Sequence, residues 1–122
     1  MSREKQEWEK TIESWGRHLC LERGLSVNTI AAYTTNLSDF ATHLCSAPLT
    51  TKLPSEVTKA DIEEYMVVLY ERRTTPTTQA RNLSALRAFF RYLVFKGIMT
   101  DSPTAKVSSP KTGRTLPDTL ST

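Results

Sequence analysis

The 122-residue chain has little of what a disulfide framework, a metal site or a membrane span requires. Its two cysteines, Cys20 and Cys45, show no CxxC spacing and have no histidine at ligand spacing, so we expect buried thiols in a reducing compartment. No apolar run approaches the ~20 residues of a membrane span, and the charged N-terminus lacks the apolar region of a secretory signal. These absences predict a cytoplasmic protein without metal or membrane association.

Patterns that carry catalysis are also lacking. The sequence has no Gly-rich phosphate loop, no HExxH and no GxSxG,. His18 and His43 fall in separate segments without a partner pattern, and Asp61, Glu63 and Glu64 have the pattern of a solvated acidic face. We therefore predict no catalytic residue and no cofactor, and that the chain as given is not an enzyme.

Charge is distributed unevenly along a chain whose net charge is +3. Residues 1–76 contain 9 Lys/Arg and 11 Asp/Glu, a net charge of −2, whereas residues 77–122 contain 7 and 2, a net charge of +5. A basic patch is the electrostatic footprint of a polyanionic partner. Any such surface should lie in the C-terminal part, although a solvated basic face without a partner fits the charge equally well.

Four segments have the 3.6-residue apolar periodicity of amphipathic helices, whereas none alternates like a strand. The predicted helices span about 4–21, 27–46, 59–72 and 76–96. The predicted core stripes are Trp8, Ile12, Trp15 and Leu19; Ile30, Tyr33, Leu37, Phe40, Ala41 and Leu44; Ile62, Tyr65, Met66 and Leu69; and Leu83, Leu86, Phe90, Leu93 and Val94. The fold class is therefore predicted to be all-α.

Residues typical of helix ends flank these segments. Ser26, Thr58 and Thr75 stand at predicted N-caps, and Gly24 and Gly97 follow the first and fourth helices,. A loop with two prolines separates the second helix from the third, and a short helical turn is expected from residue 103,. The Ser-, Thr- and Pro-rich residues 108–122 are predicted to be a linker.

The fourth predicted helix contains no Asp or Glu. An ordinary solvated face mixes acids with bases, whereas here arginines alternate with small residues. Arginines reach phosphates and guanine edges, small residues let a helix approach a groove closely, and a helix start offers N–H groups to a phosphate. The aromatic residues Phe89, Phe90, Tyr92 and Phe95 are expected in the core. The outer arc is predicted to comprise Thr77, Arg81, Ser84, Ala85, Arg87, Ala88 and Arg91. Duplex DNA is the predicted partner, and a basic helix without a partner is the alternative.

Three stretches carry recognisable motifs. A Gly-Leu-Ser-x-x-Thr start leads into Tyr and Leu at helical spacing, a Val-Thr-x-x-Asp-Ile helix follows, and then an Arg-x-Leu-Ser-Ala-Leu-Arg-x-Phe-Phe run. Their residues are Gly24, Leu25, Ser26, Thr29, Tyr33, Leu37, Val57, Thr58, Asp61, Ile62, Pro76, Thr78, Arg81, Leu83, Ser84, Ala85, Leu86, Arg87, Phe89, Phe90, Gly97, Pro103, Pro110 and Lys111. Over about residues 15–121 the chain thus resembles the Xer/phage-integrase family of tyrosine recombinases.

The resemblance implies a SAM-like orthogonal bundle of four to five helices, the integrase N-terminal core-binding domain, over residues 1–107. Residues 108–122 would be a linker towards a catalytic domain absent from this chain, since the closing Leu-Pro-x-x-Leu-Ser is similar to the family's catalytic-domain start. The second and fourth helices would approach the major groove. The DNA-binding residues implied are Asn28, Thr29, Thr35, Thr77, Thr78, Arg81, Ser84, Arg87, Arg91 and Lys111.

The function implied is the DNA-binding half of a site-specific recombinase, clamping duplex DNA at the recombination site. The parent would be tetrameric on DNA, with a separate catalytic domain that cleaves and rejoins strands, and the isolated domain would be a monomer. Thr34 and Thr35 stand where many members have Arg-Arg, so fewer phosphate contacts are expected. The alternative is a SAM-type protein–protein interaction module with an exposed apolar patch. A helix-turn-helix regulator fits less well, because no tight turn joins two short helices.

Overall fold

The computed structural model describes residues 3–46 and 51–105 of the chain, and the regular secondary structure of these residues is helical. The elements are α1 (Arg3–Leu21), α2 (Val27–Leu44), the 3₁₀ turn η2 (Pro54–Glu56), α3 (Lys59–Glu71) and α4 (Pro76–Phe95). No strand occurs in these residues. The all-α prediction is confirmed, and the predicted helix ends differ from the observed ones by at most two residues.

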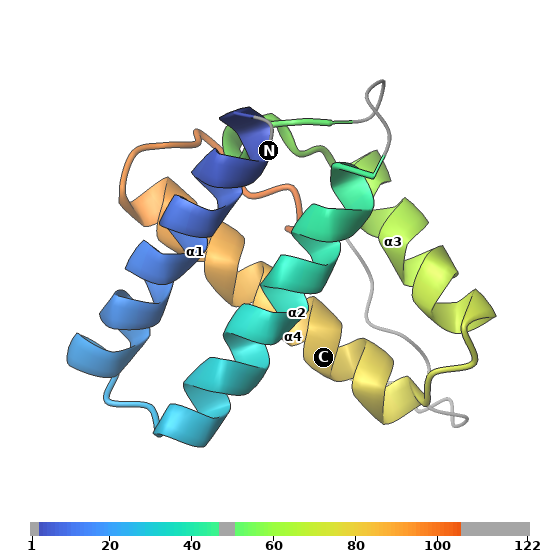
Figure 1. Ribbon diagram of the computed structural model, residues 1–122, viewed down its shortest axis with the longest axis horizontal. Helices are drawn as coiled ribbons and strands as arrows, with labels where there is room; N and C mark the ends of the chain where they lie inside the picture. Colours follow the sequence, from blue (N-terminus) through green and yellow to red (C-terminus); the bar gives the residue numbers. More distant parts are fainter. Residues whose placement is uncertain (1–2, 47–50, 106–122) are drawn as a thin grey trace.

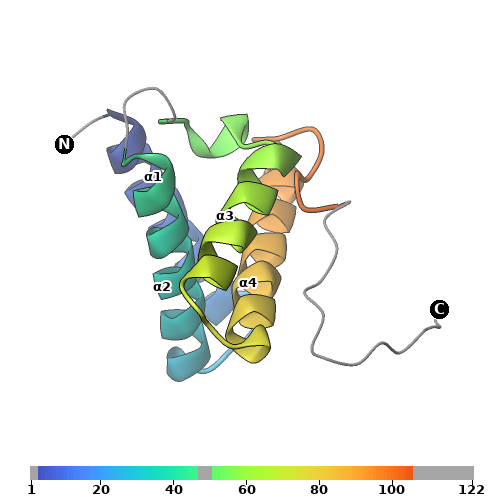
Figure 2. The same ribbon diagram turned by 90° about the vertical axis from the view of Figure 1, so that its right-hand side faces the viewer.

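The helices form a bundle in which α4 contacts each of the other three. Figure 1 shows α1 and α2 running antiparallel in front, α4 crossing behind them, and α3 on the opposite side from α1. The helices alternate in direction. As a result α2 and α4 begin at the end of the bundle where α1 and α3 finish, as both views show (Figures 1 and 2).

The predicted helix boundaries are confirmed by their hydrogen bonds. The hydroxyls of Ser26, Thr58 and Thr75 each accept a bond from the backbone N–H three residues further on. Gly24 and Gly97 have φ angles of 64° and 78°. This left-handed region is accessible to glycine without steric cost, so the chain turns sharply where α1 and α4 end.

The core centres on an aromatic cluster that joins α1, α2 and α4. Phe89 stacks on Trp8 with ring centroids 5.7 Å apart and meets Trp15 edge-on at 5.3 Å. Phe40 of α2 meets Trp8 edge-on at 5.8 Å. The Trp8 indole N–H donates to the Lys52 carbonyl at 2.7 Å, so its polar edge is satisfied although the ring is fully buried,.

The buried arc of α4 is wider than its apolar stripe predicts. Gln79, Asn82 and Tyr92 are buried as well, because α4 has helices on three sides. Their polar groups are satisfied: Gln79 and Asn82 donate to the carbonyls of Thr74 and Thr78 at 3.0 and 2.9 Å, and the Tyr92 hydroxyl bonds Ser14 Oγ at 2.7 Å. The predicted stripe therefore describes only part of the core, and its last member, Val94, is only half-buried.

Three other core expectations were wrong. Phe95 is 75% exposed, because it lies in the last turn of α4 at the edge of a groove between α1 and α4, where its ring lies against only one other described ring, that of His18, with centroids 6.0 Å apart. The thiols were expected to be buried, but Cys20 is exposed and Cys45 only half-buried. Cys20 directly follows the buried Leu19, so the helical rotation turns it outward,. Partial burial nevertheless raises the pKa of the Cys45 thiol above its ordinary value.

Truncating the centre of the aromatic cluster should be far more costly than truncating the exposed ring on the same helix. Phe89→Ala is expected to lower the free energy of unfolding by about 3–5 kcal/mol, because it leaves a cavity between two tryptophans. Phe95→Ala should change it by no more than ~0.5 kcal/mol. Urea unfolding followed by circular dichroism measures both, and equal losses would contradict the assigned core.

A partly buried ion pair between Lys52 and Asp61 fixes the start of α3 to the preceding loop. Lys52 Nζ lies 2.7 Å from Asp61 Oδ2, which also accepts the Thr58 N–H at 2.9 Å. Partial burial by itself would raise the pKa of Asp61, but the hydrogen bonds from Lys52 and Thr58 outweigh it and hold the pKa below its ordinary value. Since Lys52 also accepts the Trp8 indole bond, this cluster links α3 to the core.

This arrangement predicts a pH-dependent contribution of Asp61 to stability. A depressed folded pKa stabilises the native state above the ordinary Asp pKa, and the contribution is lost as the pH falls through the folded value. At pH 7, Asp61→Asn should therefore lower the free energy of unfolding by about 1 kcal/mol, and the two proteins should converge in strong acid. Glu63→Gln, in an exposed pair, is the control; a gap for Asp61→Asn that is constant with pH would contradict the prediction.

Candidate nucleic-acid interface

The arginines of α4 occupy its solvent side but do not form a single line. Arg81 and Arg91 are exposed and Arg87 is half-buried. At 100° per residue, Arg81 and Arg87 lie about 120° apart around the helix. Ser84, between them, is exposed. The predicted arc is therefore a broad face of α4, with the exposed Arg81 at one edge and the half-buried Arg87 at the other.

One residue of the predicted arc belongs to the core. Ala85 is fully buried, and Ala88 is half-buried against α1. The small residues of α4 were expected to let the helix approach a groove. Three helices pack against α4, and the small, buried side chain of Ala85 instead lets its neighbours approach closely. Ser84 is the small residue that remains exposed on the outer face.

The first turn of α4 is organised by its cap. The Thr75 hydroxyl accepts the Thr78 N–H at 3.1 Å and donates to Thr78 Oγ1 at 3.1 Å. Pro76, at the first helical position, has no N–H,. Among the described groups of this turn, the Thr77 N–H is consequently the one left to meet an anion, and the Thr77 side chain beside it is exposed,.

The first turn of α2 has the same construction. The Ser26 hydroxyl accepts the Thr29 N–H at 3.2 Å and donates to Thr29 Oγ1 at 3.0 Å. Thr29 is half-buried by these contacts, whereas Asn28 is exposed. Asn28 is therefore the better placed of the two predicted residues to contact a partner.

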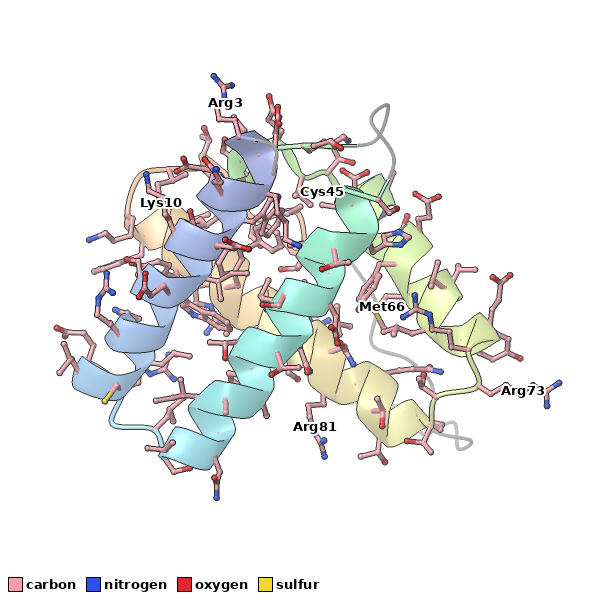
Figure 3. The ribbon with its side chains drawn as sticks, viewed as in Figure 1. Arg3, Lys10, Cys45, Met66, Arg73 and Arg81 are labelled. Carbon is pink, nitrogen blue, oxygen red and sulfur yellow. The ribbon has the colours of Figure 1, made fainter. Side chains whose placement is uncertain are left out.

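Both helix starts lie at the same end of the bundle, and Arg81 points outward from that end (Figures 1 and 3). We call this surface the cationic end, defined by Asn28, Thr29, Thr77, Thr78 and Arg81. Each helix start carries about half a positive charge from the aligned peptide dipoles. The structure thus places five of the predicted residues, from two segments far apart in the sequence, at one end of the bundle.

The cationic end also contains arginines that the sequence did not single out. Arg23 lies in the turn between α1 and α2, and Arg72 and Arg73 lie in the turn between α3 and α4. All three are exposed, and Figure 3 shows Arg73 extended into solvent. Glu22 and Glu71 adjoin them. The net charge of residues 1–76 is negative, so summing charge along the chain did not point to these arginines. Counting the charged residues near each predicted helix end would have identified them.

The other predicted residues lie elsewhere. Thr35 is exposed on the side of α2 opposite its buried Leu37 face, away from α4,. Arg87 and Arg91 line a groove of about 420 Å³ between α4 and residues 100–105, which also contains Asp101. Lys111 lies outside the residues that the structure describes, as does the predicted linker. The site as predicted therefore divides into the cationic end and a lateral groove.

The described residues contain no group of three or more His, Cys, Asp or Glu side chains placed to hold a metal ion. None of their helices is long and apolar enough to cross a membrane. The structure therefore describes a four-helix bundle with a cationic end built from two capped helix starts and the arginines around them.

Comparison with known proteins assigns this bundle to a family. The family model of the phage integrase N-terminal SAM-like domain matches residues 12–97. The chain belongs to this family, and the predicted resemblance is confirmed. No solved structure matches the chain.

Curated relatives match over most of the chain. The chain is 40% identical over 109 residues to tyrosine recombinase XerC of Roseiflexus castenholzii. This match covers 89% of this chain and 34% of the relative. It is 37% identical over 110 residues to tyrosine recombinase XerD of Shewanella oneidensis, with 90% and 36% covered. For tyrosine recombinase XerD of Chlorobaculum tepidum the identity is 32% over 122 residues, with 98% and 38% covered. The chain thus spans about a third of the length of these relatives.

Proposed function

We propose that this chain is the DNA-binding, core-binding domain of a site-specific tyrosine recombinase, which holds duplex DNA at the recombination site. The observation that carries the proposal is the cationic end, where two helix starts and Arg81 lie at the same end of the bundle in a member of the phage integrase SAM-like family. Helix starts and arginines are the protein groups that bind phosphates and guanine edges. Because its relatives are named tyrosine recombinases, we propose the same activity for the parent protein of this chain.

We further propose that this domain contributes binding and no chemistry. The matched region is the N-terminal SAM-like domain, and it spans only about a third of the relatives. Strand cleavage and rejoining would belong to a separate C-terminal catalytic domain of a parent that is tetrameric on DNA. Tyr33 is not a candidate nucleophile, since its ring stacks on Trp15 at 6.0 Å and closes one side of the core.

The exposed apolar side chains give little support to a pure protein–protein interaction module. Leu21 ends α1, Val27 begins α2, Val67 and Tyr70 lie on α3, Phe95 ends α4 and Ile98 follows it. These positions are spread over several elements rather than gathered in one patch, whereas an interaction module of this kind should present a contiguous apolar surface.

Salt dependence of DNA binding tests the proposal directly. Fluorescence anisotropy of a labelled duplex of about 30 base pairs should show binding that weakens with salt, with each phosphate contact contributing about −0.9 to the log–log slope. Because the cationic end offers few contacts, we expect a slope of only a few units. Failure to bind even at low salt would overturn the proposal for this chain.

Arg81 provides the sharper test, with Arg3 as a matched control. The two side chains lie at opposite ends of the bundle (Figure 3), and both are exposed. Arg81→Ala should weaken binding several-fold and reduce the salt slope by about one unit, because one phosphate contact is lost. Arg3→Ala should leave both unchanged, and both variants should melt like the wild type. Equal losses of binding for the two variants would mean that only overall charge matters.

A further inference from the structure

One arginine in the turn between α3 and α4 has a backbone conformation that glycine adopts at the other helix ends. α1 and α4 are each followed by a glycine in the left-handed region, Gly24 at φ 64° and Gly97 at φ 78°. α3 is followed by Arg73 in the same region, at φ 61°. Within the part of the chain that the structure describes, Arg73 is the only residue other than glycine with a positive φ.

The hydrogen bonds of this turn do not involve the arginine side chain. The Arg73 N–H donates to the Tyr70 carbonyl at 3.0 Å and the Thr74 N–H to the Leu69 carbonyl at 3.3 Å, which is the Schellman pattern of a helix end,. Glycine is the usual residue at this position, because a Cβ atom is crowded by the backbone in the left-handed region. An arginine here therefore lowers the stability of the fold relative to glycine.

No contact of the Arg73 side chain within the described residues offsets this loss. Arg73 is exposed and forms no ion pair with another described residue. Figure 3 shows its side chain extending into solvent beyond the turn. The folded domain thus holds a guanidinium in an unfavourable backbone position without using it internally, which points to a partner outside the domain.

Arg72, the residue before it, already supplies a positive charge at this helix end. A cation near the C-terminus of a helix interacts favourably with the helix dipole, and Arg72 does so with an ordinary backbone, at φ −79°. Burial raises the pKa of Tyr65 to about 12, and the nearby charge of Arg72 opposes that rise. Arg72 therefore lies close to the body of α3, and the helix end needs no second arginine to balance its dipole.

The location of Arg73 indicates what kind of partner it meets. The turn lies at the end of the bundle where α2 and α4 begin and where Arg81 points outward (Figures 1 and 3). Thr77, whose N–H is open to an anion, follows in the first turn of α4. Arg73 therefore extends the cationic end past the start of α4 towards α3, and the partner that suits this position is an anion.

We propose that Arg73 binds a backbone phosphate of the duplex beside the start of α4, and that its left-handed backbone directs the side chain there while lowering the stability of the fold. The proposal rests on the proposed function and adds a specific residue to it. A guanidinium forms short, charge-assisted hydrogen bonds with a phosphate, whereas glycine would give a more stable turn and no such contact. DNA binding and stability therefore make opposite demands at this position.

Two substitutions separate the charge of Arg73 from its backbone conformation. Arg73→Gly removes both the guanidinium and the crowded Cβ atom, whereas Arg73→Ala removes only the guanidinium. Thermal unfolding followed by circular dichroism should give Arg73→Gly a melting temperature a few degrees above those of Arg73→Ala and the wild type. In anisotropy titrations with the labelled duplex, both variants should bind several-fold more weakly, with a salt slope reduced by about one unit. Arg3→Ala, at the opposite end of the bundle, is the control for lost charge.

Three results would overturn this role of Arg73 while the proposed function stands, provided that the wild type binds DNA. The first is wild-type affinity for both Arg73 variants. The second is an equal loss of affinity for Arg73→Ala and Arg3→Ala, because only overall charge would then matter. The third is a melting temperature of Arg73→Gly that does not exceed that of Arg73→Ala, because the turn would then carry no strain. A wild type that fails to bind overturns both proposals, and the titration of the wild type alone identifies that case.

Discussion

The packing of Phe89 between Trp8 and Trp15 is the contact on which the rest of the structure depends. It fixes α4 against α1, and α4 in turn contacts α2 and α3. A helix packed on three sides has little surface left, so every solvent-facing position of α4 is confined to the remaining arc. Arg81, Ser84 and Arg91 occupy that arc because the aromatic cluster determines which side of α4 is free.

The direction of the helices is the second constraint, and it determines the electrostatics. Antiparallel packing places the starts of α2 and α4 at one end (Figure 1), so the positive ends of two helix dipoles are on the same side of the bundle. The caps add to this effect, since Ser26 and Thr75 satisfy one N–H each and hold the first turns in place. The charge of this end therefore arises from backbone topology as well as from arginine side chains.

The fold was more predictable than the site because local rules govern its parts. Ser26, Thr58 and Thr75 cap helix starts through hydrogen bonds to a residue only three positions further on. Such short-range caps can be predicted from the residue types in the sequence. The burial of Ala85 and the exposure of Phe95 are not local. They depend on which side of α4 its neighbours cover, and the apolar stripe alone does not fix the width of that contact. Likewise, Arg23 and Arg73 join the cationic end only through the crossing of helices that are distant in sequence.

A net charge of only +3 gives a weak overall attraction to a polyanion, so the arrangement of charge matters more than its sum,. Acidic side chains such as Glu9 on α1 and Glu64 on α3 face solvent along the flanks, whereas α4 has none. In the proposed function, phosphates would be repelled from the flanks and attracted to the cationic end, which orients the domain on the duplex more than it tightens binding.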